Sequence, residues 1–329
     1  MQDDVLEATA TDAPAQADTI DMADLSQQDW LDRIEELGEE RGYFEPLGKR
    51  HSVVLTDEGP TLIVTFETVE TIREGSDSQE PMGWELVEGQ GWSNLSLIAH
   101  DDTWFRDPAV YGYFDRLVDD GFFEDFDHVV FYGAGMCAYA AAAYSVVAPG
   151  ATVIALQPQA TLDPKVARWD QRFPQMRRVS FSDRYGYAPD MVEGAEQVFV
   201  IHDPEVQLDA MHASLFTRAN VTQLTCPRLG DDLEAKLWRM GVLPEMLDLA
   251  ARDELTATAF HRAYRQARRV NMPYLRSLLD RLQGEQRHRM VQMLCNSVVK
   301  RMNAPRFRRA RDGAAQMLDK TREVEELSL

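Results

Sequence analysis

One stretch of the chain, residues 128–159, constrains the fold more than any other. It reads HVVFYGAGMCAYAAAAYSVVAPGATVIALQPQ, in which an apolar run, a glycine-spaced turn, an alanine-rich run and a second apolar run follow one another. Uniformly apolar runs are typical of strands buried on both faces of a sheet, and the alanine-rich run from Met136 to Val147 is typical of a helix. The stretch therefore predicts two parallel strands joined by a helix.

Similar apolar runs recur on both sides of this stretch and alternate with helical patterns. Runs that predict strands lie at residues 95–100, 177–181, 197–203 and 221–227. Two earlier runs, 51–58 and 61–69, are separated by a Glu-Gly-Pro turn and predict antiparallel strands that open the domain. Because strands that alternate with helices favour parallel crossovers, we predict an α/β fold. It would be a three-layer sandwich around a doubly wound, mostly parallel sheet.

The chain divides into three parts by composition. Residues 1–25 are acidic and rich in Ala, Asp and Thr, which predicts a disordered N-terminus. Residues 26–242 hold the predicted sheet, and residues 243–329 predict a basic, all-helical subdomain because apolar residues recur there every three or four positions. The net charge of −21 is unevenly spread. The first 150 residues carry 32 acidic and 7 basic side chains, whereas the last 79 carry 9 acidic and 17 basic ones.

Charge and composition argue against several classes of protein. An acidic front half repels phosphates, so nucleic acid is not an expected partner. No run approaches the roughly 18 apolar residues of a membrane span, and the N-terminus lacks the basic start and apolar core of a signal peptide. Three widely spaced cysteines predict no disulfide framework. We expect a cytoplasmic protein without metal or cofactor, whose Arg-rich tail either binds an acidic protein partner or is only a basic appendage.

The turn between the first strand and the helix spans Gly133 to Cys137 and reads Gly-Ala-Gly-Met-Cys. A strand followed by Gly-x-Ser-x-Gly and a helix is the turn on which many enzymes mount a nucleophilic serine. The start of the helix then points backbone N–H groups at the reacting oxygen. Here Gly133 and the central Gly135 allow the tight turn, but no hydroxyl stands at its centre. The sequence therefore predicts a hydrolase-type turn that lacks its nucleophile.

A family resemblance rests on this turn. YGAGMCAYAAAAYS resembles the YGxSMGGYAAL elbow of α/β-hydrolase-fold proteins, with Met136 and Tyr139 in register. The downstream ALQPQATLDP resembles the Pro-Gln strand end of a bacterial branch of that superfamily, some of whose members accompany glycan-handling proteins. The resemblance covers roughly residues 50–240 and leaves out the helical tail. It implies the α/β-hydrolase fold.

The resemblance also implies where a catalytic triad would lie. The nucleophile would fall on Gly135, and the acid on Asp203, just after the run VFVIHD. The histidine would fall in the loop after the last strand, which here reads Gly230-Asp231. A triad without nucleophile and base has no ordinary acyl-transfer route. The resemblance therefore implies a degenerate branch in which glycine has replaced the serine.

Relocated catalytic groups are the alternative. Cys137 lies in the first helical turn, where a thiol pKa can fall, but two residues rotate its side chain by about 200° from the elbow centre. Asp209 and His212, three residues apart, share a helix face and predict a surface hydrogen-bonded pair, with an acid–base pair or half of a metal site as the rival interpretations. Asp203 follows a strand together with His202, so it is the better-placed acid.

Polar and aromatic residues at the strand ends predict a pocket, because ligands of parallel sheets bind at the carboxyl ends of the strands. Amides, a guanidinium and an aromatic face are the groups that hold sugars, and Gln157, Gln159, Trp169 and Arg172 supply them. The alternative is a structural loop with an Arg–Asp ion pair. The expected pocket residues are His100, Asp102, Trp104, Gly133, Gly135, Met136, Gln157, Gln159, Arg172, Asp203 and Asp231.

A dinucleotide-binding interpretation of the same turn fails on one residue. The run Gly-Ala-Gly-Met-Cys-Ala satisfies a relaxed G-x-G-x-x-A fingerprint. The acidic residue expected after the next strand is missing, and Gln157 stands there. We therefore predict a catalytically degenerate hydrolase-like protein that binds a glycan-type ligand or a protein partner in bacterial surface-polysaccharide metabolism. The alternatives are an active hydrolase or acyltransferase with a relocated group, and a scaffold that acts through its basic helical tail.

Overall fold

The computed structural model describes residues 22–75 and 78–327. Most of the predicted disordered N-terminus, residues 1–21, lies outside the described residues. The last four residues of that segment belong to the fold. Met22–Asp24 form a 3-10 turn, and Met22 and Leu25 pack against the cluster around Trp30 and Ile34.

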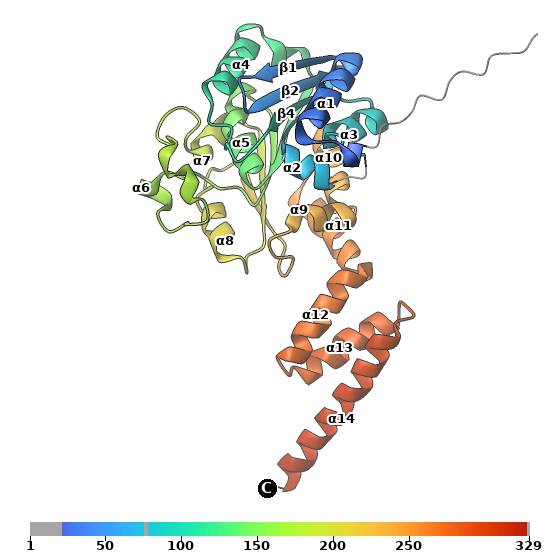
Figure 1. Cartoon of the computed structure of the whole chain (residues 1–329). Helices are drawn as coiled ribbons and strands as arrows, with labels where there is room; N and C mark the ends of the chain where they lie inside the picture. Colours follow the sequence, from blue (N-terminus) through green and yellow to red (C-terminus); the bar gives the residue numbers. More distant parts are fainter. Residues whose placement is uncertain (1–21, 76–77, 328–329) are drawn as a thin grey trace, which may run out of the picture.

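An eight-stranded sheet forms the core of the domain from which the last helices of the chain extend (Figure 1). The strand order is β1-β2-β4-β3-β5-β6-β7-β8. The second strand runs antiparallel to both of its neighbours, and the third to eighth strands are mutually parallel. This confirms the predicted mostly parallel sheet. The strands are β1 (Tyr43–Leu47), β2 (His51–Thr56), β3 (Thr61–Thr68), β4 (Ser93–Ala99), β5 (His128–Ala134), β6 (Thr152–Leu156), β7 (Gln197–His202) and β8 (Val221–Thr225).

Two local predictions about strands were wrong. The runs around β2 and β3 do not form an antiparallel pair, because β4 lies between them and β3 is parallel to β4 and β5. Seven of the eight residues of β3 are buried, as suits an inner strand covered on both faces. The predicted strand 177–181 is absent: Pro174–Arg178 form a 3-10 turn, and Phe181 enters the core from a loop.

Helices cover both faces of the sheet. α4 (Pro108–Asp119) and α5 (Met136–Tyr144) pack on one face, and almost the whole of α5 is buried. Helices of the other face share a second cluster with β5, β6 and β7. The remaining helices of this part are α1 (Gln27–Arg41), α2 (Val69–Gly75), α3 (Met82–Gln90), α6 (Pro164–Ala167), α7 (Ala188–Met191), α8 (Gln207–Ala213), α9 (Leu233–Arg239), α10 (Val242–Ala251) and α11 (Ala257–Val270). The observed layers confirm the predicted three-layer sandwich.

The C-terminal region is helical, as predicted, but its helices pack in two groups. α10 and α11 share the hydrophobic cluster of the sheet through Met246, Leu247 and Phe260. α12 (Met272–Gly284), α13 (His288–Val299) and α14 (Pro305–Leu327) form a separate cluster around Leu279 and Phe307. They project away from the sheet domain (Figure 1). The boundary at residue 243 remains a sequence-based prediction, whereas the change of hydrophobic partner lies near residue 271.

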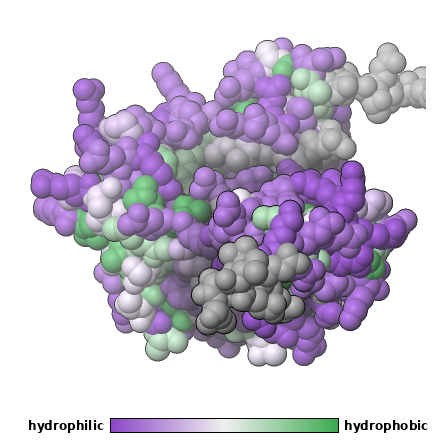
Figure 2. Space-filling view, turned by 90° about the horizontal axis from the view of Figure 1, so that it is seen from below, coloured by the Kyte–Doolittle hydropathy of each residue, from purple (hydrophilic) through white to green (hydrophobic). Residues whose placement is uncertain are grey.

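The surface seen from below is mainly hydrophilic, with hydrophobic side chains gathered in patches on one side (Figure 2). Within residues 22–75 and 78–327, no helix combines the length and the apolar character needed to cross a bilayer.

Candidate functional site

The turn after β5 has the geometry of a nucleophile elbow. Gly135 adopts φ 59° and ψ −123°, a conformation that L side chains rarely take, and α5 begins at the next residue. Its N–H donates to the carbonyl of Leu156 at 2.8 Å, which fixes the turn against β6. Gly133 is required for packing, because a Cβ there would lie 2.3 Å from the carbonyl oxygen of Cys137. A Cβ on Gly135, by contrast, would meet no atom within 4 Å beyond its chain neighbours.

The position after β7 is occupied by a buried acid. Asp203 is 1% exposed, and its two carboxylate oxygens accept hydrogen bonds from the backbone N–H groups of Glu205 at 2.9 Å and Gly230 at 2.7 Å. Gly230 belongs to the loop after β8, where the resemblance implied a histidine. Asp231 in the same loop is exposed. Asp203 therefore binds the main chain of the loop after β8 directly, and no imidazole lies between the carboxylate and that loop.

Three features of the structure occur together. The eight-stranded sheet is mostly parallel with an antiparallel second strand, a nucleophile elbow follows the fifth strand, and an acidic residue follows the seventh. The chain has the α/β-hydrolase fold. No protein-family model matches the sequence. A comparison with curated proteins also finds no match.

Several solved structures are similar to this chain. EstE1, a thermostable carboxylesterase from a metagenomic library, is 12% identical, with 72% of this chain and 98% of that chain covered and a TM-score of 0.40. A hormone-sensitive lipase from a metagenome library is 16% identical, with coverages of 70% and 91% and a TM-score of 0.41. The capsule O-acetyltransferase of Neisseria meningitidis serogroup A is 10% identical, with coverages of 57% and 87% and a TM-score of 0.38. Because the sequence identities and TM-scores are this low, the fold assignment rests on the strand order and the elbow of this chain.

Two of the residues expected near the sheet edge, Gln157 and Arg172, form one partly buried polar network with Asp170 and Asp209. Arg172 donates to Asp209 at 2.7 Å and forms a two-pronged ion pair with Asp170, from Nε to Oδ1 at 3.1 Å and from Nη2 to Oδ2 at 2.8 Å. Gln157 donates to the other oxygen of Asp209 at 2.8 Å. The predicted surface pair of Asp209 and His212 was wrong, because both side chains are buried and bind different partners. The network satisfies its own donors and acceptors, as a structural loop with an Arg–Asp ion pair would.

His212 has no free ring nitrogen. Its Nδ1 accepts the N–H of Ala160 at 3.2 Å, so its proton lies on Nε2, which donates to Asp170 at 3.0 Å. The ring is 0% exposed, and burial lowers its pKa below the usual value. Trp169 packs on it with ring centroids 4.5 Å apart. Gln159 is also buried, and its amide donates to the carbonyl of Gln157 at 3.2 Å. Its burial and its two hydrogen bonds therefore hold His212 as a neutral structural group.

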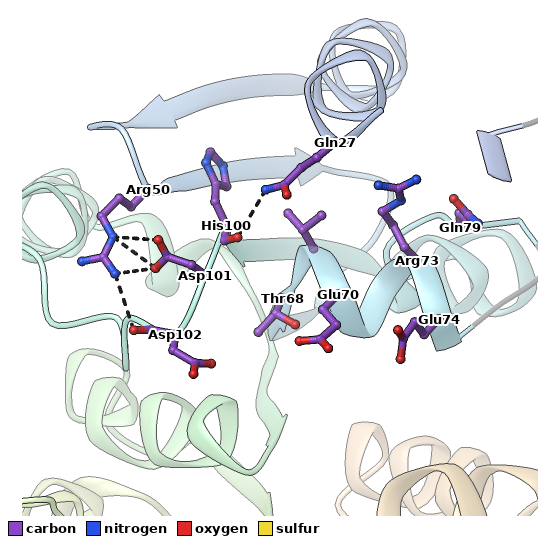
Figure 3. Close-up of a pocket in the computed structure, with 11 residues that line it drawn as sticks. Gln27, Arg50, Thr68, Glu70, Arg73, Glu74, Gln79, His100, Asp101 and Asp102 are labelled. Carbon is purple, nitrogen blue, oxygen red and sulfur yellow. Dashed lines mark hydrogen bonds and ion pairs between the residues drawn. The ribbon is translucent and has the colours of Figure 1, made fainter. Parts of the chain in front are cut away.

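The polar cluster after β4 borders an open hollow of about 760 Å³ (Figure 3). His100, Asp101 and Asp102 line it together with Arg50, which forms an ion pair with Asp101. His100 is bonded to Ser52 at 2.9 Å through Nε2. In Figure 3 the Asp101 carboxylate points toward the guanidinium of Arg50, whereas Asp102 points away from it. His100 and Asp102 thus lie where the sequence placed them, at a strand end.

Trp104 was expected to form an aromatic wall of this pocket, but it is a core residue. It is 1% exposed and packs edge-on against Phe173 at 4.6 Å. Trp104 and Phe105 both have positive φ, 51° and 53°. These backbone conformations turn both rings into the core, which the sequence could not show because neither residue favours positive φ.

A second cavity of about 470 Å³ lies beside the elbow. Its wall on the elbow side is formed by Ala134 and Cys137. Other lining residues come from β3, with Phe66 and Glu67, and from α9, with Glu234 and Trp238. Of the predicted site residues, only Cys137 lines this cavity. Gly133, Gly135 and Met136 lie in the adjoining turn.

Two carboxyl groups of this cavity have perturbed acidity. Glu67 is 8% exposed and accepts hydrogen bonds from Thr65 at 3.0 Å, Ser96 at 3.1 Å and the N–H of Met82 at 3.0 Å. Burial nevertheless raises its pKa to about 7. Burial also raises the pKa of Glu234, although that group accepts a hydrogen bond from the hydroxyl of Tyr132 at 2.5 Å.

Cys137 is not an activated nucleophile. Its side chain is buried, and burial together with the negative charges of Glu234 and Glu67 raises the thiol pKa well above its ordinary range. The thiol therefore stays protonated at neutral pH. The described part of the chain also contains no cluster of three His, Cys, Asp or Glu side chains arranged to hold a metal ion.

Sequence reasoning missed Glu67, Tyr132 and Glu234. One signal for Glu67 was available: it is the only charged residue in the apolar run TLIVTFETV. A charge inside a strand buried on both faces needs a specific reason. Nothing in the sequence pairs Tyr132 with Glu234, which lies 102 residues later.

Proposed function

We propose that this chain is a catalytically inactive protein with the α/β-hydrolase fold, which uses the elbow edge of its sheet to bind a ligand. One observation carries the proposal. Gly135 has the elbow backbone conformation and open space where a side chain would stand, so the turn retains its shape without a nucleophile. The backbone conformation of this turn is strained for any residue other than glycine, and an ordinary strand–helix connection does not need it.

The remaining candidates for catalytic groups support inactivity. Each carboxylate oxygen of Asp203 accepts one backbone N–H, from Glu205 and from Gly230. His212 is buried and bonded through both nitrogens. The thiol of Cys137 is held protonated by its surroundings. Acyl transfer needs a nucleophile and a base within hydrogen-bonding reach of each other, and none of these three groups supplies such a pair.

The glycan-type ligand and the surface-polysaccharide role rest on the family resemblance. The side chains expected to hold a sugar, Gln157, Gln159 and Arg172, bind one another or neighbouring acids. We therefore propose the cavity beside the elbow as the ligand site. Its walls are formed by hydrophobic side chains and glutamates, and its volume of about 470 Å³ lies within the usual range for small-molecule pockets.

Hydrolysis assays test the inactivity directly. We expect purified full-length protein to hydrolyse p-nitrophenyl acetate and an acetyl thioester no faster than Cys137→Ala and Asp203→Asn variants, all at the rate of the buffer. Circular dichroism establishes that each variant is folded. Turnover well above the buffer rate that collapses in either variant would overturn the proposal and identify a relocated catalytic group.

A scaffold role through the basic helices is the second candidate, and one observation favours it. α12–α14 have their own hydrophobic core, project from the sheet domain, and expose Met290 and Met293 by 43% and 60% (Figure 1). We expect immobilised polyglutamate to retain the full chain, and Arg289→Glu combined with Arg309→Glu to weaken retention. Equal retention of the double variant would refute this role. Charge reversal is preferable to deletion of residues 243–329, which would remove helices that pack on the sheet.

A further inference from the structure

We propose that the cavity beside the elbow binds an organic cation, an ammonium group on an apolar body, with the ammonium group held by Glu67 and Glu234. This inference rests on the proposed ligand-binding function and adds the chemical class of the ligand. Its basis is that two carboxyl groups without an ion-pair partner among the described residues, Glu67 buried and Glu234 partly buried, line one cavity together with apolar side chains.

The charge of the lining is strongly negative. Arg239 is the one basic residue that lines the cavity within the part of the chain that the structure describes. Arg41, which lies outside the lining, forms ion pairs with Glu80 at 3.7 Å and Glu88 at 3.0 Å. The acidic lining residues are Glu67, Glu74, Glu80, Glu85, Glu88 and Glu234. An anion would therefore be repelled, and a cation would be attracted.

Glu67 and Glu234 lack counter-charges of their own. Neither forms an ion pair with a basic side chain within the described ranges, in contrast to Glu80 and Glu88. Glu67 is held by three neutral donors, and Glu234 by the hydroxyl of Tyr132. Buried ionised carboxylates are costly unless a cation compensates them. A bound ammonium group would supply the missing positive charge.

The rest of the cavity suits an apolar body. Phe66, Met82 and Trp238 line it, and the indole of tryptophan is an aromatic ring of the kind that attracts cations. The thiol of Cys137, which is 5% exposed, also lines the cavity and has no hydrogen-bond partner among the described residues. A neutral sugar would leave the carboxylates of Glu67 and Glu234 without a positive charge and would place hydroxyl groups against the apolar side chains.

Two ligands that differ only in charge test the inference in the unmodified protein. Phenethylamine carries an ammonium group on an aromatic body, and 2-phenylethanol carries a hydroxyl in its place. By isothermal titration calorimetry at pH 8, we expect phenethylamine to bind at least tenfold more tightly. Its affinity should fall between pH 8 and pH 6, because Glu67 takes up a proton there. Equal affinities, or tighter binding of the alcohol, would overturn the inference.

Charge-neutral variants locate the site. We expect Glu67→Gln and Glu234→Gln each to weaken phenethylamine binding at least tenfold, whereas Glu35→Gln, an exposed glutamate on α1, leaves it unchanged. Since Glu234 is only partly buried, its variant remains informative if Glu67→Gln fails to fold. Binding that survives Glu234→Gln unchanged would overturn the assignment. Hydrolysis is measured on the same preparations, so absence of amine binding refutes the ligand class, whereas turnover refutes the proposed inactivity.

Discussion

The carboxylate of Asp203 accepts the backbone N–H of Gly230 at 2.7 Å, and this bond ties the end of β7 to the loop after β8. In the triad implied by the resemblance, the other oxygen of this carboxylate would accept a hydrogen bond from an imidazole. Here the second oxygen accepts the N–H of Glu205 instead. Asp203, at the acid position of the fold, thus bonds to the main chain on both sides, and we expect it to contribute to stability.

Replacement of Asp203 should therefore affect stability. Asp203→Asn keeps one acceptor oxygen but turns an amide group toward the other backbone N–H. We expect a loss of about 1–3 kcal/mol in the free energy of unfolding, measured by chemical denaturation. The matched control is Asp231→Asn in the same loop, where the side chain is exposed and the change should stay within about 0.5 kcal/mol. Equal effects of the two variants would contradict this role for Asp203.

The two glycines of the elbow should respond differently to substitution. At Gly135 an added side chain enters open space, so Gly135→Ser should fold, with a cost of about 1–2 kcal/mol for the left-handed backbone. Gly133→Ala should be far more destabilising, because its Cβ would meet the carbonyl of Cys137 at 2.3 Å. Thermal denaturation of both variants checks this order. A Gly133→Ala protein as stable as Gly135→Ser would refute the elbow geometry.

Restoring the hydroxyl alone should not restore catalysis. Gly135→Ser provides a nucleophile position, but the loop after β8 reads Gly230-Asp231 and offers no imidazole. We expect p-nitrophenyl acetate hydrolysis to remain at the buffer rate. Turnover that appears in Gly135→Ser and is lost on a further His202→Gln change would show that His202, at the end of β7, serves as a base.

Glu67 should make stability fall as pH rises. Its folded pKa of about 7 lies above the ordinary value of 4.5, so the folded state binds more protons between these values. Its contribution is fully present below pH 4.5 and is lost as pH rises through about 7, with a total on the order of 3 kcal/mol. Glu67→Gln should flatten this dependence, since an amide can accept from Met82 and donate to Ser96. The test is chemical denaturation of the unmodified protein and of Glu67→Gln between pH 5 and pH 8. The same change of unfolding free energy with pH in both proteins would contradict this prediction.

The buried histidine should be a structural residue. His212→Ala would leave the buried N–H of Ala160 without its acceptor and would remove one of the donors to Asp170, with an expected cost of about 2–4 kcal/mol. His261→Ala, on an exposed face of α11, should cost less than about 0.5 kcal/mol. Urea denaturation of the two variants distinguishes them. A similar small effect at both positions would show that the His212 network contributes little.

Local signals explain which parts of the fold the sequence could predict. The stretch 128–159 carries its own apolar runs, glycines and helix formers, so β5, the elbow, α5 and β6 follow from neighbouring residues. β1 was missed because its five residues include Pro46, which disfavours a strand. The pairing of β3 with β4 and β5 could not be read locally, because two strands joined by a short turn most often form a hairpin.

The candidate site was harder to predict than the fold. His100 and Asp102 lie at a strand end as expected, since sequence position alone fixes that edge. The burial of Glu67 and the contact of Tyr132 with Glu234 depend on how α9 packs near β5, a long-range arrangement without a local signature. Trp104 and Arg172 have side chains that suit a pocket, but the tertiary fold uses them in the core and in an ion network.

The most direct test of the vacant elbow is a search for an acyl-protein intermediate. Nucleophilic acyl transfer must pass through a covalent acyl group on the protein. The full chain would be incubated with p-nitrophenyl acetate, quenched in acid, and mapped by peptide mass spectrometry. The vacant elbow predicts no acetyl group on the peptide that contains Gly133 to Cys137. A thioester on Cys137 that forms and decays during turnover would contradict it.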